Sequence, residues 1–374
     1  MKKQAQTGPE RTGLQTLVCV VCGLVGLAAV VVSLLTTVFG NLFVVTLESG
    51  EALVVTYMPA ISVGGVAYTQ EPFSLFTMAT TSEQWIPLMQ VLVEGIMNTD
   101  MTIIMESLIP GSVALIVALV AVSLSSLIAL IATIVAIIGF LKGLFSKKYF
   151  SLARPLAWVL GANVSIYLAC VFGGVSAWVS PASAVFMNIL LSALALGLTA
   201  IGNVLCAGKS ALSLGGIMRF ASSVCVFVGA LICVLLFPMV ITEGANTSMN
   251  EALMHFLTAL FSLFQGGEFV EPTMPDFAYV AISFVMTIAF IFLLAGFLSK
   301  ASNRLASSFS FNGKRKGLIF RSVLNIILLL VFIVPTVLYV GTIGETAAPE
   351  VFAILAGGII SLIGAILHKV FINK

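Results

Sequence analysis

The chain has 374 residues, of which 60% are hydrophobic and 9% are charged, whereas about a quarter of the residues in an ordinary soluble domain are charged. This composition excludes a water-soluble globular protein, because one core cannot bury so much apolar surface and lipid must solvate most of it. The net charge of +2 hides an uneven distribution of charge along the chain.

The apolar runs of the chain predict eight membrane-spanning helices. A span needs about 20 apolar residues to cross the hydrocarbon of a bilayer. Eight runs meet this requirement, at 14–39, 112–141, 155–178, 184–208, 217–241, 277–299, 319–341 and 350–371. With the N-terminus inside, all 17 Lys and Arg fall on one side of the membrane, and every Asp and Glu except Glu10 falls on the other. Because Lys and Arg are held on the cytoplasmic side, we expect a multi-pass plasma-membrane protein with both termini in the cytoplasm.

The N-terminal part predicts a cytoplasmic tail, a retained signal anchor and a structured outer segment. The tail, 1–13, is basic, and the apolar run after it is longer than the core of about 7–15 residues in a cleaved signal. In the outer segment, 40–108, β-branched runs on either side of Ser49-Gly50-Glu51 predict a hairpin. The sequence of residues 83–97 predicts a helix with Pro87 near its first turn. We therefore expect a small β-containing extracytoplasmic segment.

The two halves of the chain share one layout, which predicts a duplication. Each half reads as a span, a long acidic outer segment, a span, a basic inner loop, a span, a short outer turn and a last span. The halves are 14–208 and 209–374, with outer segments 40–108 and 242–275. Asn163 and Asn325 occupy matching places when the halves are aligned. A four-span unit preserves orientation, so the fold would consist of two parallel four-helix repeats.

The layout of each half is similar to that of claudin-type four-span proteins, which also carry a strand-bearing outer segment and a short helix before the second span. The resemblance is one of layout. The outer segment 40–108 has no cysteine pair, and its tryptophan, Trp85, lies in the predicted helix.

Polar residues inside the spans are uncharged. The middle of each span lacks Asp, Glu, Lys, Arg and His, which disfavours an ion-coupled carrier, because such carriers commonly keep ionisable groups at mid-membrane. Asparagines remain at four positions, namely Asn163, Asn188, Asn203 and Asn325. They could line a pore or a central ligand site, or they could form interhelical hydrogen bonds worth about 0.6 kcal/mol each. The second explanation is the commoner one.

The outer segments concentrate acidic residues. The positive-inside rule explains why Lys and Arg are absent from such segments, but acidic residues contribute little to that rule. An acidic outer surface could focus cations or bind a basic partner, or it could consist of ordinary solvated loops. The candidate residues of this surface in the second half are Glu243, Glu251, Glu268, Glu271 and Asp276. Asn246 begins a glycosylation sequon, which matters only in a eukaryotic source.

A basic turn lies on the inner side between the sixth and seventh spans. Its candidate contacts to lipid are Lys314, Arg315 and Lys316. Such residues bind anionic lipid head groups at about 1 kcal/mol per charge, although a role as a topological anchor is sufficient to explain them.

The sequence carries no pattern that predicts catalysis, a metal or another cofactor. It contains no phosphate loop, nucleophile elbow, acid–base pair, metal-ligand quartet or nucleic-acid-binding signature, and its six cysteines all fall within predicted spans. We therefore predict a non-catalytic structural or accessory subunit of a membrane assembly, which contacts the bilayer and either a second copy or another membrane protein. The alternative is a cation-permeable channel or uncoupled carrier with an acidic outer vestibule.

Overall fold

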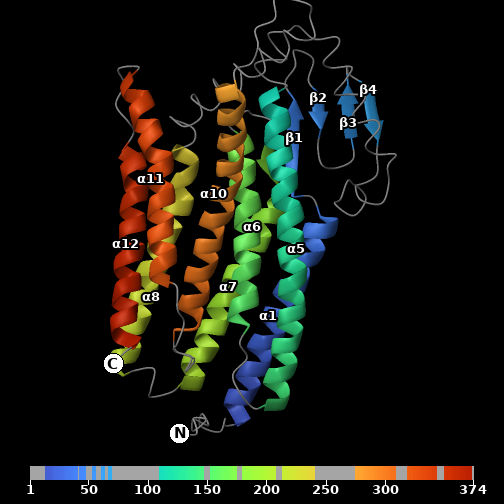
Figure 1. Ribbon diagram of the computed structural model, residues 1–374. Coiled ribbons are helices and arrows are strands. Elements are labelled where there is room, and N and C mark those ends of the chain that lie inside the picture. Colours follow the sequence, from blue (N-terminus) through green and yellow to red (C-terminus); the bar gives the residue numbers. More distant parts are fainter. Residues whose placement is uncertain are drawn as a thin grey trace, which may run out of the picture.

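The protein is a long helical bundle with a small sheet at one end, seen in the computed structural model of Figure 1. The structure describes residues 13–40, 42–47, 53–55, 60–63, 66–69, 109–146, 152–174, 179–207, 213–240, 274–308, 318–342 and 349–372. The described part contains eight helices, which are α1 (Gly13–Phe39), α5 (Ile109–Ser146), α6 (Ala153–Gly174), α7 (Ser183–Ala207), α8 (Leu214–Val240), α10 (Met274–Ala306), α11 (Leu318–Thr342) and α12 (Pro349–Ile372).

Each predicted span coincides with one of these helices. Six of the helices, α1, α5, α6, α7, α8 and α12, are long and apolar enough to cross a membrane. In α11, the apolar stretch Leu318–Leu330 is shorter. These lengths and compositions confirm a membrane-embedded helical protein.

The helices bury small side chains and expose large apolar ones. On α5, Ala129, Ala132 and Ala136 are fully buried, whereas Leu127 and Ile134 are more than half exposed. This distribution suits a bundle in lipid, where small residues let helix backbones approach and large apolar residues face the acyl chains.

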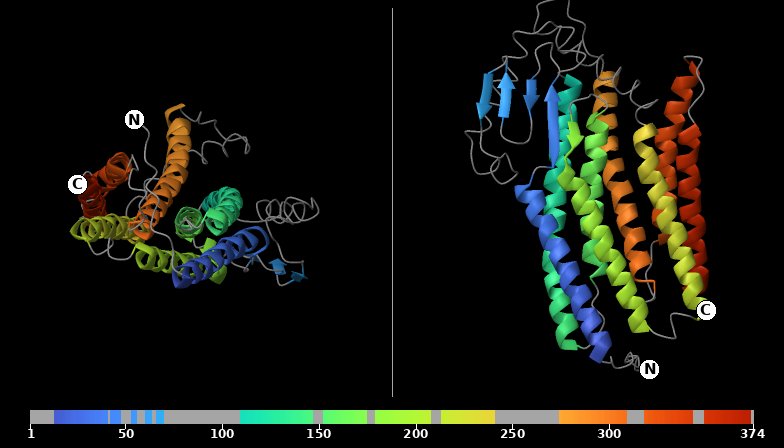
Figure 2. Two further views of the ribbon diagram at one scale, coloured as in Figure 1. Left: turned by 90° about the horizontal axis from the view of Figure 1, so that it is seen from below. Right: turned by 180° about the vertical axis from the view of Figure 1, so that it is seen from behind.

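The bundle has two groups of helices joined by α10. In the first group, α1 contacts α5 and α7, and α6 contacts both α5 and α7. In the second group, α8 packs against α12 and α10, and α11 contacts α12 and α10. Helix α10 also packs along α6 and α7, so it lies between the groups when the bundle is seen from below (Figure 2).

The closest helix pair is α8 with α12, and glycines permit it. A Cβ atom added to Gly364 would lie 2.9 Å from the backbone oxygen of Ser222, and one added to Gly357 would lie 3.0 Å from the backbone oxygen of Gly229. These two glycines of α12 therefore serve a helix contact within the chain.

The sheet lies at the end of the bundle opposite the start of α1 and the end of α12 (Figure 1). Its strands are β1 (Phe43–Leu47), β2 (Leu53–Val55), β3 (Ala60–Val63), β4 (Val66–Thr69) and β5 (Val179–Pro181). All pairs are antiparallel, in the order β4-β3-β2-β1-β5. Strand β5 lies in the connection from α6 to α7, for which the sequence suggested only a short turn. The predicted helix at 83–97 lies outside the described residues.

Candidate anion-binding pocket

Two of the residue sets singled out in the sequence fall outside the described side chains. Residues 241–273 and 309–317 contain four of the acidic candidates and the basic turn with Lys314, Arg315 and Lys316. Asp276 lies in the first turn of α10, but its side chain is not among those described. The outer acidic surface and the basic turn therefore stay predictions.

Asn163 connects three helices of the first group. It is fully buried on α6. Its Nδ2 donates to the hydroxyl of Ser33 on α1 at 2.8 Å and to the carbonyl of Val159 at 2.9 Å. Its Oδ1 accepts a bond of 3.2 Å from Nδ2 of Asn188 on α7. Because both ends of the Asn163 amide are engaged, the arrangement holds helices together and leaves that amide little capacity for a ligand.

The other two asparagines lie elsewhere in the bundle. Nδ2 of Asn203 on α7 donates to the carbonyl of Ala306 at the end of α10 at 2.7 Å. Nδ2 of Asn325 on α11 lies 3.9 Å from the sulfur of Cys233 on α8. Since Asn203 and Asn325 each contact a different helix pair, the geometry favours interhelical bonding over one shared polar site.

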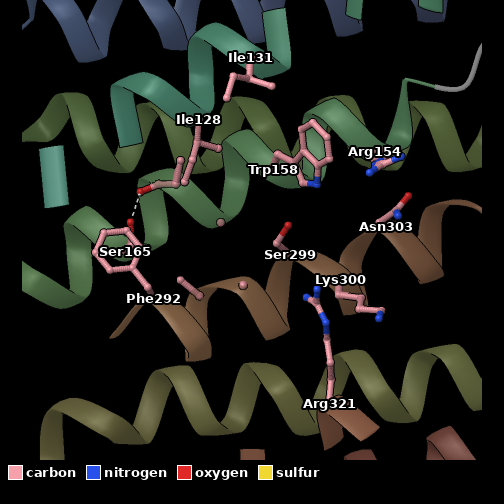
Figure 3. A pocket seen from close by; sticks show the side chains of 14 residues that line it. Ile128, Ile131, Arg154, Trp158, Ser165, Phe292, Ser299, Lys300, Asn303 and Arg321 are labelled. Atoms are coloured by element: carbon pink, nitrogen blue, oxygen red, sulfur yellow. Dashed lines mark hydrogen bonds between the residues drawn. The ribbon is translucent and has the colours of Figure 1, made fainter. Parts of the chain in front are cut away.

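A cavity of about 530 Å³ opens between α5, α6, α10 and α11, where the two groups of helices meet (Figure 3). It is referred to below as the basic pocket. The residues that line it are Ile128, Ile131, Arg154, Trp158, Gly161, Ala162, Ser165, Phe292, Ala295, Gly296, Ser299, Lys300, Asn303 and Arg321. The described lining residues include three basic side chains and no acidic one. Clefts of this size commonly hold small molecules.

The three basic residues come from three helix ends that converge. Arg154 lies in the first turn of α6 and Arg321 in the first turn of α11, whereas Lys300 lies near the end of the antiparallel α10. Figure 3 shows these side chains on one side of the pocket. The N-termini of α6 and α11 add partial positive charge at the same end. The potential there favours an anion.

Neighbouring groups shape the polar end of the basic pocket. The guanidinium carbon of Arg154 lies 4.6 Å from the ring centroid of Trp158, a cation–π distance that holds the charge beside the cavity. Gly161 allows α6 and α10 to meet, because a Cβ atom added to it would lie 2.7 Å from Cβ of Ser299. These contacts place charged, aromatic and hydroxyl groups around one opening.

The other end of the basic pocket is apolar. Ile128, Ile131 and Phe292 form its walls, and Ser165 there is already bonded to the hydroxyl of Ser125 at 3.0 Å. Arg154 and Ser165 lie about 16 Å apart along α6 at a rise of 1.5 Å per residue. Ile131 is 45% exposed on the outer face of α5, so the apolar end borders the lipid.

One buried polar atom of the basic pocket has no hydrogen-bond partner among the described residues. Oδ1 of Asn303 is buried and accepts no hydrogen bond from the residues that the structure describes. Buried acceptors in proteins are nearly always bonded, and each exception needs an explanation.

A second polar cluster joins α8 to α12. Nδ1 of His368 lies 3.1 Å from the hydroxyl of Ser222 and 3.4 Å from that of Ser223. Within the described residues, no three His, Cys, Asp or Glu side chains are grouped so as to hold a metal ion.

The basic pocket was not anticipated from the sequence. Arg154, Lys300 and Arg321 are far apart along the chain, and each is explained by topology alone. The signal that could have found them is their common position at helix ends that the sequence predicts to face the cytoplasm. As built, the basic pocket can bind an anion attached to an apolar group. No protein-family profile, curated protein or solved structure matches the chain.

Proposed function

We propose that the chain is a non-catalytic accessory protein of the plasma membrane that binds an anionic lipid in the basic pocket. One observation carries the proposal. Basic side chains from α6, α10 and α11 converge on a cavity whose other end is apolar and borders lipid. Three basic residues at a membrane surface supply about 1 kcal/mol each, which together corresponds to a preference of about 100-fold for an anionic head group.

The orientation of the bundle supports an inner-leaflet ligand. All Lys and Arg of the described helices lie at the bundle end where α1 begins and α12 ends, and Asp276 and Glu350 lie in the first turns of helices that begin at the other end. By the positive-inside rule, we place the basic end in the cytoplasm. Anionic lipids are enriched in that leaflet, so ligand and pocket are on the same side.

The amphipathic shape favours a lipid over a soluble anion. A free anion would use only the polar end, and the walls formed by Ile128, Ile131 and Phe292 would stay unoccupied. A lipid would place its head group among the basic residues and part of an acyl chain against these walls. It could enter sideways past Ile131.

We also propose eight spans in two parallel repeats. The helix contacts support this proposal, because they follow the same pattern in both groups. In chain order, the first helix of each group (α1 or α8) contacts the second (α5 or α10) and the fourth (α7 or α12). The third helix (α6 or α11) contacts the same two helices. In both groups an asparagine of the third helix reaches the first helix, through Asn163 with Ser33 and Asn325 with Cys233. Ala193 and Gly197 lie exposed on α7 and offer a close-contact face to a second copy or another membrane protein.

The test uses Trp158 as the reporter. The chain has three tryptophans, and Trp85→Phe with Trp178→Phe leaves Trp158 alone. Trp158 is partly buried and lines the basic pocket, so quenching by lipids with brominated acyl chains reports occupancy of that pocket. We expect anionic brominated lipid to quench at much lower mole fractions than brominated phosphatidylcholine. Equal quenching by the two lipids would contradict the proposal.

The cation-channel alternative makes the opposite prediction about flux. Purified protein in liposomes should show no selective cation flux, because the amides of Asn163, Asn188, Asn203 and Asn325 form hydrogen bonds between helices and the basic pocket repels cations. Neutralising Glu243, Glu268, Glu271 and Asp276 together should leave permeability at background and reduce recovery of a partner from native membranes. A salt-sensitive cation current that falls on neutralisation would favour the channel instead, since the Debye length shrinks from about 10 Å at 0.1 M salt to about 3 Å at 1 M.

A further inference from the structure

Asn303 brings an acceptor to a pocket that otherwise suits an anion. It lies three residues after Lys300 and four after Ser299, so the three side chains share one face of α10. Figure 3 shows this face turned towards α6 with Arg154 and Trp158. Oδ1 of Asn303 is buried without a hydrogen-bond donor among the described residues. The oxygens of an anion are acceptors too, so they cannot satisfy it.

We infer that the lipid head group carries a hydroxyl next to its anionic phosphate, and that Asn303 accepts a hydrogen bond from this hydroxyl. The inference rests on the proposed function and names the class of its ligand, an anionic phosphodiester of a polyol. An amine would also supply donors, but it would bring a positive charge among Arg154, Lys300 and Arg321. A neutral O–H group is therefore the donor that fits.

The geometry allows one head group to reach both residues. Side chains three positions apart on a helix have Cβ atoms about 5–6 Å from each other, which matches a phosphate on Lys300 and a nearby hydroxyl on Asn303. The terminal torsion of asparagine is soft. Rotation about it turns Oδ1 into the pocket and breaks no hydrogen bond of that oxygen within the described residues.

The experiment compares two anionic lipids that differ in the hydroxyls. Brominated phosphatidylglycerol and brominated phosphatidylmethanol carry the same charge and the same acyl chains, but only the first has head-group hydroxyls. In the protein with Trp158 as its only tryptophan, we expect phosphatidylglycerol to quench at about a fivefold lower mole fraction, the effect of one net hydrogen bond. In Asn303→Leu the two anionic lipids should quench Trp158 alike, and both should still quench it at lower mole fractions than brominated phosphatidylcholine.

The quenching results distinguish failure of the inference from failure of the proposed function. Equal quenching by the two anionic lipids in the wild-type pocket would overturn the inference and leave the proposed function standing. A preference that survives in Asn303→Leu would overturn the role of Asn303. If neither lipid exceeded phosphatidylcholine, the proposed function would fail and the inference with it. Displacement of the lipid by soluble glycerol 3-phosphate at equal concentration would assign the site to a free phosphate ester and overturn the lipid class.

Discussion

Replacing Arg154, Lys300 and Arg321 together by glutamine is expected to lower the preference of the basic pocket for anionic lipid by about 100-fold. Glutamine keeps a long polar side chain and removes only the charge, so the cavity remains. The magnitude follows from about 1 kcal/mol for each basic residue at a membrane surface. Quenching of Trp158 by anionic and zwitterionic brominated lipids measures the change. Each single replacement should lower this preference about fivefold, because it removes one of the three charges.

A matched control separates the basic pocket from the general charge of the membrane surface. Lys142, Arg219 and Lys369 lie at the same end of the bundle but do not line the basic pocket. Their triple replacement by glutamine removes the same charge and should leave the preference within about twofold of wild type, because a Debye length of about 10 Å screens exposed distant charges. An equal loss in both triple variants would mean that lipids respond to the surface potential alone.

The second large effect is expected at the contact between α8 and α12. Gly364→Ala should destabilise the bundle by about 1–3 kcal/mol, the usual cost of overpacking, although alanine favours a helix more than glycine by about 1 kcal/mol. The new methyl group would lie 2.9 Å from the backbone oxygen of Ser222 and 2.9 Å from the backbone nitrogen of Val226. Backbone atoms cannot move aside as a flexible side chain can, so the helices must separate.

Gly197→Ala is the control for that measurement. Gly197 also lies in an apolar helix, but a Cβ atom added to it has nothing within 4 Å. This variant should keep or slightly raise the stability in a detergent unfolding titration, because only helix propensity changes. If Gly364→Ala were as stable as Gly197→Ala, the close packing of α8 on α12 would be contradicted.

The sequence by itself determined where the described helices lie along the chain. Within the residues that the structure describes, apolar runs predicted a helix at every place where one occurs, and the errors lie at the ends. Helix α5 extends to Ser146 and α10 to Ala306, several residues beyond the predicted spans. A spanning helix is a local property of about 20 residues in lipid, whereas a helix that leaves the lipid can continue without an apolar signal.

Only the tertiary structure decided which residues meet. It paired β5 with β1, so that Val179 is the partner of Val45, and it joined Asn163 to Ser33 and Asn188. It also brought Arg154, Lys300 and Arg321 to one cavity. No periodicity predicts these contacts, because all helices in lipid are apolar and their association depends on close packing of small residues and a few hydrogen bonds. The basic pocket is therefore a property of how helices pack across the two halves.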